Sequence, residues 1–136
     1  MVRRVVFDTN VLISGYLWKG SARRALEKVR GDDWTLLISN EALEELIRVL
    51  AYDKFGLKPE DIEPIIHDLA SISQFVEVNT RIETIKADPT DNIFLALAAD
   101  GDAHAIVSGD HHLLDLGEFR GIQILRIRQF LLQNSH

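Results

Sequence analysis

Two aspartates follow short apolar segments that have the length of buried β-strands. Asp8 comes directly after Val5-Val6-Phe7, and Asp110 comes three residues after Val107. In an open parallel sheet, ligands bind beyond the carboxyl ends of the strands. Because both acids lie at such ends, we expect their carboxylates at the same edge of one sheet.

A third acid precedes a segment with the composition of a buried helix. From Ile93 to Ala99 no residue is polar, which is typical of a helix that is covered on all sides. Such a helix beside central strands would carry Asp91, and with it Asp88, toward the same crevice. Aspartate at a helix start also caps free backbone N–H groups and is favoured by the helix dipole. The sequence leaves both roles open for Asp91 and favours a turn or capping role for Asp88.

The fourth acid is expected on the segment 40–50, where apolar residues recur with the spacing of one buried helical face. The residues of this face are Leu43, Leu46, Ile47 and Leu50, with Ala42 and Val49 on one flank. Glu45 borders that flank and Glu44 borders the opposite side, whereas Glu41 points outward. Helical phase alone does not separate Glu44 from Glu45.

Carboxylates that converge in one crevice raise each other's pKa and destabilise the fold unless a cation offsets their charge. The chain has no cysteine, and its histidines do not have zinc-ligand spacing, so the expected ligands are oxygen atoms. Oxygen ligands favour Mg²⁺ or Mn²⁺. His111 and His112 follow Asp110, but adjacent side chains diverge in direction. We therefore expect one loop histidine and one partly packed histidine there.

The elements that must position these acids follow from the hydrophobic pattern. Short apolar runs with the length of strands occur at 4–7, 35–38, 75–78, 105–107 and 122–125. Helical patterns lie between them. The expected N-caps are Ser21 and either Ser39 or Asn40, and the other helices are expected to begin near Asn10, at Pro59, and around Thr90 or Asp91. Strands that alternate with helices predict an α/β fold, a three-layer α/β/α sandwich with a central parallel sheet of about five strands.

Composition narrows the class of protein. A chain of 136 residues with 46% hydrophobic and 26% charged residues suits one globular domain over residues 1–136. No apolar run approaches the roughly 18 residues of a membrane span, and only three apolar residues follow the arginines near the start, too few for a signal peptide. We therefore expect a cytoplasmic protein. The 21 acidic and 15 basic residues argue against a broad cationic face for duplex DNA.

Four segments, in order and at suitable spacing, resemble the successive motifs of the PIN domain family. They are residues 6–14, 38–39 with 45–50, 88–92, and 106–110. More narrowly, the pattern is similar to that of PIN-domain toxins of toxin–antitoxin modules, the VapC-type ribonucleases. The similarity extends over essentially the whole chain and therefore implies a PIN-like fold.

The resemblance implies an acidic site for Mg²⁺ or Mn²⁺ formed by Asp8, Glu45, Asp91 and Asp110. It favours Glu45 over Glu44, because the family's glutamate directly precedes a leucine. It also implies that hydroxyl and amide groups support the carboxylates and bound water, at Thr9, Asn10 and Ser108.

The activity implied is metal-dependent hydrolysis of phosphodiester bonds in single-stranded RNA, with 5′-phosphate and 3′-hydroxyl ends. The implied partners are the RNA substrate, a cognate antitoxin and a second copy of the chain in a homodimer. Arg23, Arg24 and Arg48 are candidates for contacts with RNA phosphates, and a solvated helix face is the alternative interpretation.

Two positions depart from the family pattern. His112 stands where many relatives have a second aspartate, and Ile93 stands where a basic residue is usual. These departures keep open a non-catalytic PIN-like module that binds proteins. Another metal-dependent phosphoesterase is a further alternative, but the haloacid-dehalogenase type needs a second aspartate at the position of Asn10.

Overall fold

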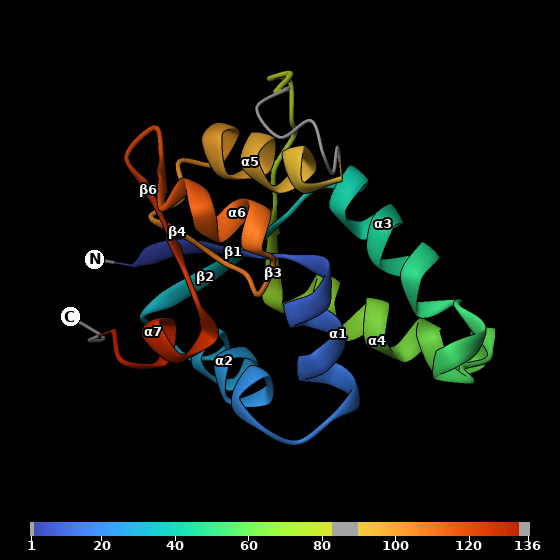
Figure 1. Cartoon of the computed structure of the whole chain (residues 1–136). Coiled ribbons are helices and arrows are strands. Elements are labelled where there is room, and N and C mark those ends of the chain that lie inside the picture. Colours follow the sequence, from blue (N-terminus) through green and yellow to red (C-terminus); the bar gives the residue numbers. More distant parts are fainter. Residues whose placement is uncertain (1, 83–89, 134–136) are drawn as a thin grey trace.

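The computed structural model describes residues 2–82 and 90–133. Helices cover both faces of a central sheet (Figure 1). The strands are β1 (Arg3–Phe7), β2 (Trp34–Ile38), β3 (Ser73–Phe75), β4 (Ala105–Val107), β5 (Glu118–Phe119) and β6 (Ile122–Leu125). The helices are α1 (Thr9–Leu17), α2 (Ser21–Arg30), α3 (Asn40–Leu50), α4 (Pro59–Ile72), α5 (Asp91–Asp100), α6 (His111–Leu116) and α7 (Ile127–Leu131), with a short 3₁₀ helix at Asp53–Phe55.

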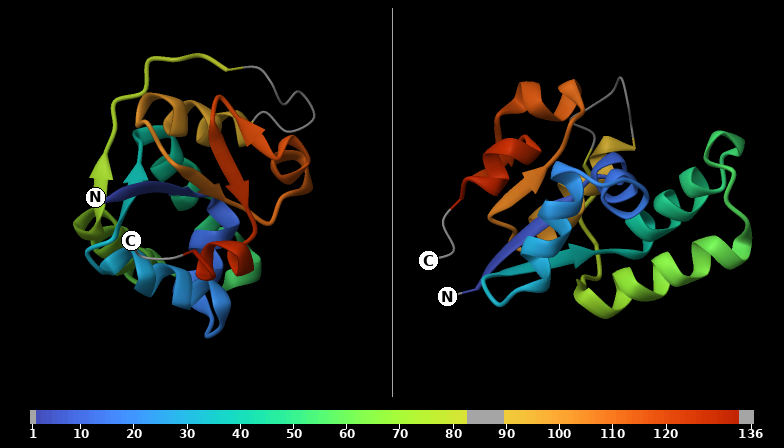
Figure 2. Two further views of the ribbon diagram at one scale, coloured as in Figure 1. Left: turned by 90° about the vertical axis from the view of Figure 1, so that its left-hand side faces the viewer. Right: turned by 90° about the horizontal axis from the view of Figure 1, so that it is seen from below.

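The sheet has the strand order β3-β2-β1-β4-β6-β5. All neighbours pair in parallel except β5, which pairs antiparallel with β6. Helix α5 lies over one face of the sheet and helices α2 and α7 lie over the other (Figure 2). The predicted α/β/α sandwich is therefore confirmed. The sequence pattern did not predict the short antiparallel strand β5 or the helices α6 and α7.

The centre of the molecule is apolar from one helical layer to the other. Val5, Val6, Ile106 and Val107 have no exposed surface, as expected for central strands of a parallel sheet covered on both faces. Leu95 on α5 is equally buried. The uninterrupted apolar runs of β1, β4 and α5 thus have one cause, which is burial on every side.

Two local predictions were wrong. The strand expected at 75–78 lies at Ser73–Phe75, at the edge of the sheet and directly after α4. Ser21 is not a cap but the first residue of α2, and the N-cap is Gly20 with a φ of 146°. Glycine reaches this backbone conformation because it has no Cβ, so the chain begins α2 without a side-chain cap.

Helices α3 and α4 contact each other and extend as a pair away from the sheet (Figures 1 and 2). Ser39 caps α3, because its hydroxyl accepts a hydrogen bond of 3.2 Å from the backbone N–H of Ala42. Pro59 opens α4 as predicted. Among the described residues, no helix is long and apolar enough to cross a membrane.

The contact between α1 and α2 gives a test of the packing behind the site. A Cβ on Gly15 would lie 2.6 Å from Leu26 Cδ1 and 3.1 Å from the carbonyl oxygen of Ala22. We expect Gly15→Ala to lower the free energy of unfolding by about 1 kcal/mol, because overpacking outweighs the better helix propensity of alanine. Urea titration measures the change. Gly31→Ala is the control, since its Cβ would meet only Lys28 O at 3.5 Å; equal stability of the two variants would contradict this account.

Candidate functional site

Parallel pairing of β1 with β4 brings the first and last acids together. Phe7 is paired with Val107, and the backbone N–H of Asp8 donates to the carbonyl of Val107 at 3.1 Å. The hydroxyl of Ser108 donates to a carboxylate oxygen of Asp8 and accepts from the backbone N–H of Asp110 at 2.9 Å. One serine therefore links the two acids, as expected at the carboxyl ends of neighbouring strands.

Asp8 is a buried carboxylate, with 3% of its surface exposed. It is also the N-cap of α1, because Oδ1 accepts a hydrogen bond of 2.9 Å from the backbone N–H of Val11. Burial raises the pKa of Asp8, and the negative charge of Asp110 raises it further, against the lowering effect of the Ser108 and Val11 hydrogen bonds. A full negative charge at this position is thus unfavourable unless a cation lies beside it.

Glu45 lies on the buried side of α3 and Glu44 on its exposed side. The side chain of Glu45 is only 12% exposed and accepts hydrogen bonds from Arg48 Nη2 at 2.6 Å and Nε at 3.2 Å. The same guanidinium donates to the hydroxyl of Tyr52 at 2.5 Å. The structure thus separates the two glutamates, and the one near the other acids is already paired with an arginine.

The predicted buried face of α3 was partly wrong. Ala42, Leu46 and Leu50 are buried, but Ile47 is 40% exposed. The helix packs against α1, α4 and α5, and these contacts turn its buried stripe toward the flank of Ala42. That rotation places Glu45 inside the site.

Asp91 is the first residue of α5 and is 5% exposed. Helix α5 contacts β1, β4 and α3, so its first turn faces the acids on those elements. The N-cap position belongs to Thr90. Asp88, for which we expected a turn or capping role, lies outside the described residues.

The four acids line one pocket of about 210 Å³. Its walls are formed by Asp8, Thr9, Asn10, Glu45, Arg48, Val49, Tyr52, Lys54, Thr90, Asp91, Phe94 and Asp110. Four carboxylates thus meet two cationic side chains, and one of these cations is held by Glu45. The donor set of this pocket fits a hard divalent cation, since carboxylate and hydroxyl oxygens are the ligands that Mg²⁺ and Mn²⁺ accept.

Comparison with known proteins agrees with this geometry. The sequence profile of the PIN domain matches residues 4–112. The chain belongs to the PIN domain family. The match runs from β1 into the first turn of α6 and includes the four acids of the pocket.

Solved structures show the same fold. One match is a chain in the crystal structure of VapBC2 from Rickettsia felis bound to a DNA fragment from their promoter, with a TM-score of 0.62 and 13% sequence identity. The alignment covers 90% of this PIN domain and 98% of that chain. A search of curated proteins found no sequence match.

The supporting polar residues have different environments in this PIN domain. Ser108 is fully buried and bonded to Asp8. Thr9 is buried, and its hydroxyl has no hydrogen-bond partner among the described residues. Asn10 is exposed at the pocket wall. The Thr9 hydroxyl is therefore a group that a ligand or an ordered water in the pocket would satisfy.

The three arginines named from the sequence lie in different places. Arg48 lines the pocket. Arg23 does not, because its guanidinium donates to the carbonyl oxygens of Gly15 at 3.2 Å and Tyr16 at 3.0 Å, which joins α2 to α1. Arg24 is exposed on α2. The role of these arginines in binding RNA stays a prediction.

Tyr52 and Lys54 also line the pocket, and neither was assigned to the metal site from the sequence. A signal for Tyr52 was present, because Glu45, Arg48 and Tyr52 are spaced three and four residues apart, the spacing of one helical face, although α3 ends at Leu50 and Tyr52 lies just beyond it. The position of Lys54 depends on the turn after α3, which helical periodicity does not describe.

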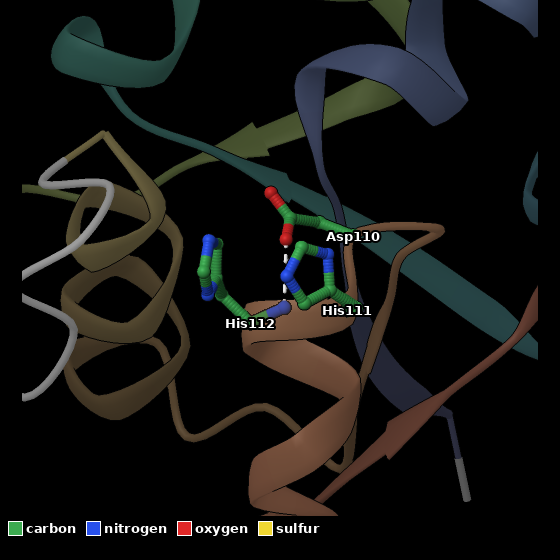
Figure 3. Close-up of side chains that lie close together, drawn as sticks. All are labelled: Asp110, His111 and His112. Atoms are coloured by element: carbon green, nitrogen blue, oxygen red, sulfur yellow. Dashed lines mark hydrogen bonds between the residues drawn. The ribbon is translucent and has the colours of Figure 1, made fainter.

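Asp110, His111 and His112 lie close together (Figure 3). The ring centroids of the two histidines are 4.1 Å apart, with the planes tilted by 38°. The expectation that these adjacent side chains diverge was wrong, because residues at a helix start do not have to project along separate helical directions. His112 is partly buried, as expected. His111 is exposed but does not lie in a loop as predicted, because it is the first residue of α6.

The burial of Asp8 predicts an effect on stability. In the presence of chelator, we expect Asp8→Asn to raise the free energy of unfolding by about 1 kcal/mol, because the amide can still cap α1 and carries no buried charge. Denaturant unfolding measures this change. Asp32→Asn, at an exposed loop position, should leave stability unchanged, and a destabilised Asp8→Asn protein would contradict the proposed cost of the charge.

Proposed function

We propose that this PIN domain is a metal-dependent endoribonuclease that hydrolyses phosphodiester bonds of single-stranded RNA. The observation that carries this proposal is the convergence of Asp8, Glu45, Asp91 and Asp110 in one pocket at the carboxyl edge of the sheet. Membership of the PIN domain family supports the same activity.

Asp8, Asp91 and Asp110 would hold Mg²⁺ or Mn²⁺, with Glu45 at the margin of the site. When bound, such an ion supplies positive charge that activates water and offsets the charge that develops on the phosphate. The protein holds these ligands in place: Ser108 and Val11 orient Asp8, and Asp110 is restrained by a hydrogen bond from the backbone N–H of His112 at 2.8 Å.

The reaction needs a group that accepts the proton of the attacking water. Glu45 would take this role, because it is the acid of the pocket that faces Arg48, which would turn toward an incoming phosphate. Water attacks phosphorus and the bond from phosphorus to the 3′ oxygen breaks. The products are a 5′-phosphate and a 3′-hydroxyl, which takes its proton from solvent.

Positive side chains at the pocket wall suit an RNA backbone. Arg48 and Lys54 lie beside the acids, and Arg24 on α2 is accessible to a strand that extends from the pocket. Single-stranded nucleic acid binds to such cations through its phosphates. Arg48 is the contact that we place nearest to the cleaved bond.

We further propose that the protein is the toxin of a toxin–antitoxin module and acts in the cytoplasm as a homodimer with a cognate antitoxin as partner. The fold shared with a chain of VapBC2 supports this proposal. A protein-binding module without catalysis is the competing function, and the cleavage assay below separates the two.

Cleavage of a fluorescent single-stranded RNA tests the activity. We expect cleavage with Mn²⁺ or Mg²⁺, none with chelator, and a loss of at least about 100-fold in Asp8→Asn, because a metal ligand has been removed. Glu45→Gln should lose activity, whereas Glu44→Gln, one position away on the exposed side of α3, should keep it. Cleavage that survives equally in Asp8→Asn, or is absent under every condition, would overturn the nuclease proposal.

RNA binding tests the role of Arg48. In the Asp8→Asn background, which prevents cleavage, Arg48→Gln should weaken RNA binding severalfold and lower the slope of log affinity against log salt by about 0.7, the value for one phosphate contact on a single strand. Fluorescence anisotropy measures both quantities. Arg128→Gln, at an exposed position on α7, is the control, and an unchanged salt slope for Arg48→Gln would refute the contact.

A further inference from the structure

The side chains of Asp110, His111 and His112 form a compact group at the start of α6 (Figure 3). Each residue offers one ligand atom, and these atoms lie within 4.8 Å of one another. No hydrogen bond joins either imidazole to another residue within the described ranges. Two nitrogen ligands and one oxygen ligand are therefore available at the same place.

The backbone under this group is well fixed. Oδ1 of Asp110 accepts a hydrogen bond of 2.8 Å from the backbone N–H of His112, and the backbone N–H of Asp110 donates to Ser108 Oγ at 2.9 Å. Leu113, the next residue of α6, has no exposed surface. The three ligand-bearing residues thus start from fixed positions, and only their side chains have to adjust.

We propose that Asp110, His111 and His112 form a metal site that binds Zn²⁺ in preference to Mg²⁺. Imidazole nitrogen is a good ligand for Zn²⁺, whereas Mg²⁺ selects oxygen ligands and retains its water. Two histidines and one carboxylate, with the remaining position open to solvent, are a known ligand set for zinc. The site therefore differs in chemistry from the oxygen-lined pocket beside it.

The distances are compatible with this ion. Zinc bonds of about 2.0 to 2.2 Å in a tetrahedron place neighbouring ligand atoms about 3.4 Å apart. The ligand atoms now lie within 4.8 Å of one another, so small side-chain rotations, above all of the exposed His111, can close the site. His111 is exposed and His112 is partly buried, so the His111 side chain has the greater freedom to rotate.

Asp110 belongs to both the proposed zinc site and the acidic pocket, which it also lines. The zinc site goes beyond the proposed nuclease and rests on it only for the second role of this carboxylate. Asp110→Asn should weaken both sites, whereas substitution of the histidines should weaken zinc binding and spare Mg²⁺ binding in the pocket. The two sites can therefore be separated by mutation.

The test is metal binding by untagged protein at about pH 7.5, above the ordinary pKa of imidazole. Excess Mg²⁺ is present, which competes with Zn²⁺ for the carboxylates of the pocket, the shared Asp110 included, but not for the imidazoles. Isothermal titration with Zn²⁺ should show one site per chain. His111→Gln and His112→Gln should each weaken binding by about tenfold or more, and the double variant should lose the site. His67→Gln, an exposed histidine on α4, should bind Zn²⁺ like the wild type.

Side-chain ¹⁵N spectra of the histidines give a readout that does not depend on activity. Zn²⁺ should shift the imidazole resonances of His111 and His112 and leave those of His67 in place. Circular dichroism of each variant shows that the fold is kept. Zinc affinity in the double variant equal to that of the wild type, or unshifted resonances of His111 and His112, would overturn the proposal.

Failure of the zinc site and failure of the nuclease give different results. A protein that binds zinc through the histidines but cleaves no RNA with Mg²⁺ or Mn²⁺ would contradict the proposed function alone. A protein that cleaves RNA through Asp8 but binds Zn²⁺ equally well without His111 and His112 would contradict the zinc site alone.

Discussion

A buried negative charge is the constraint on which the rest of the site depends. Asp8 comes directly after β1, and the pairing of β1 with β4 at the centre of the sheet holds this residue in the interior. Its hydrogen bonds with Ser108 and Val11 orient the carboxylate but do not neutralise it. Asp91 and Asp110 line the same pocket, and the negative charge of Asp110 raises the pKa of Asp8 further. The fold therefore maintains a local excess of negative charge that a divalent cation would relieve.

Arg48 offsets one part of this negative charge by pairing with Glu45. A carboxylate that is 12% exposed needs a partner, and the guanidinium three residues along the helix supplies two hydrogen bonds. Arg48 itself is exposed on its outer side, so the pair can open without disturbing the core. The hydrogen bonds to Asp8 and Asp110 come from neutral groups, and this contrast supports the proposal that these two acids hold the metal.

The sequence predicted the architecture because the relevant signals are local. Continuous apolar runs marked β1 and β4, and an apolar helix marked α5, so their terminal acids could be placed at one edge of the sheet. Helical phase could not choose between Glu44 and Glu45, because the buried stripe of α3 depends on contacts with α1, α4 and α5. The same limit applies to β5, whose two residues pair only once β6 is in place. The proximity of His111 and His112 depends on side-chain rotation at a helix start, for which sequence spacing carries no signal.

This arrangement accounts for part of the acidic excess of the chain, because several acids are gathered at one site. A formal charge of −6 argues against a broad cationic face, but four of the acids lie in one pocket, where bound cations would reverse the local charge. A phosphate backbone that approaches the pocket without metal meets carboxylates first and only then Arg48 and Lys54. Repulsion of this kind falls with bound divalent cation more steeply than with monovalent salt, because only the bound ion changes the charge inside the pocket. In the proposed nuclease, metal would therefore control the entry of RNA as well as its cleavage.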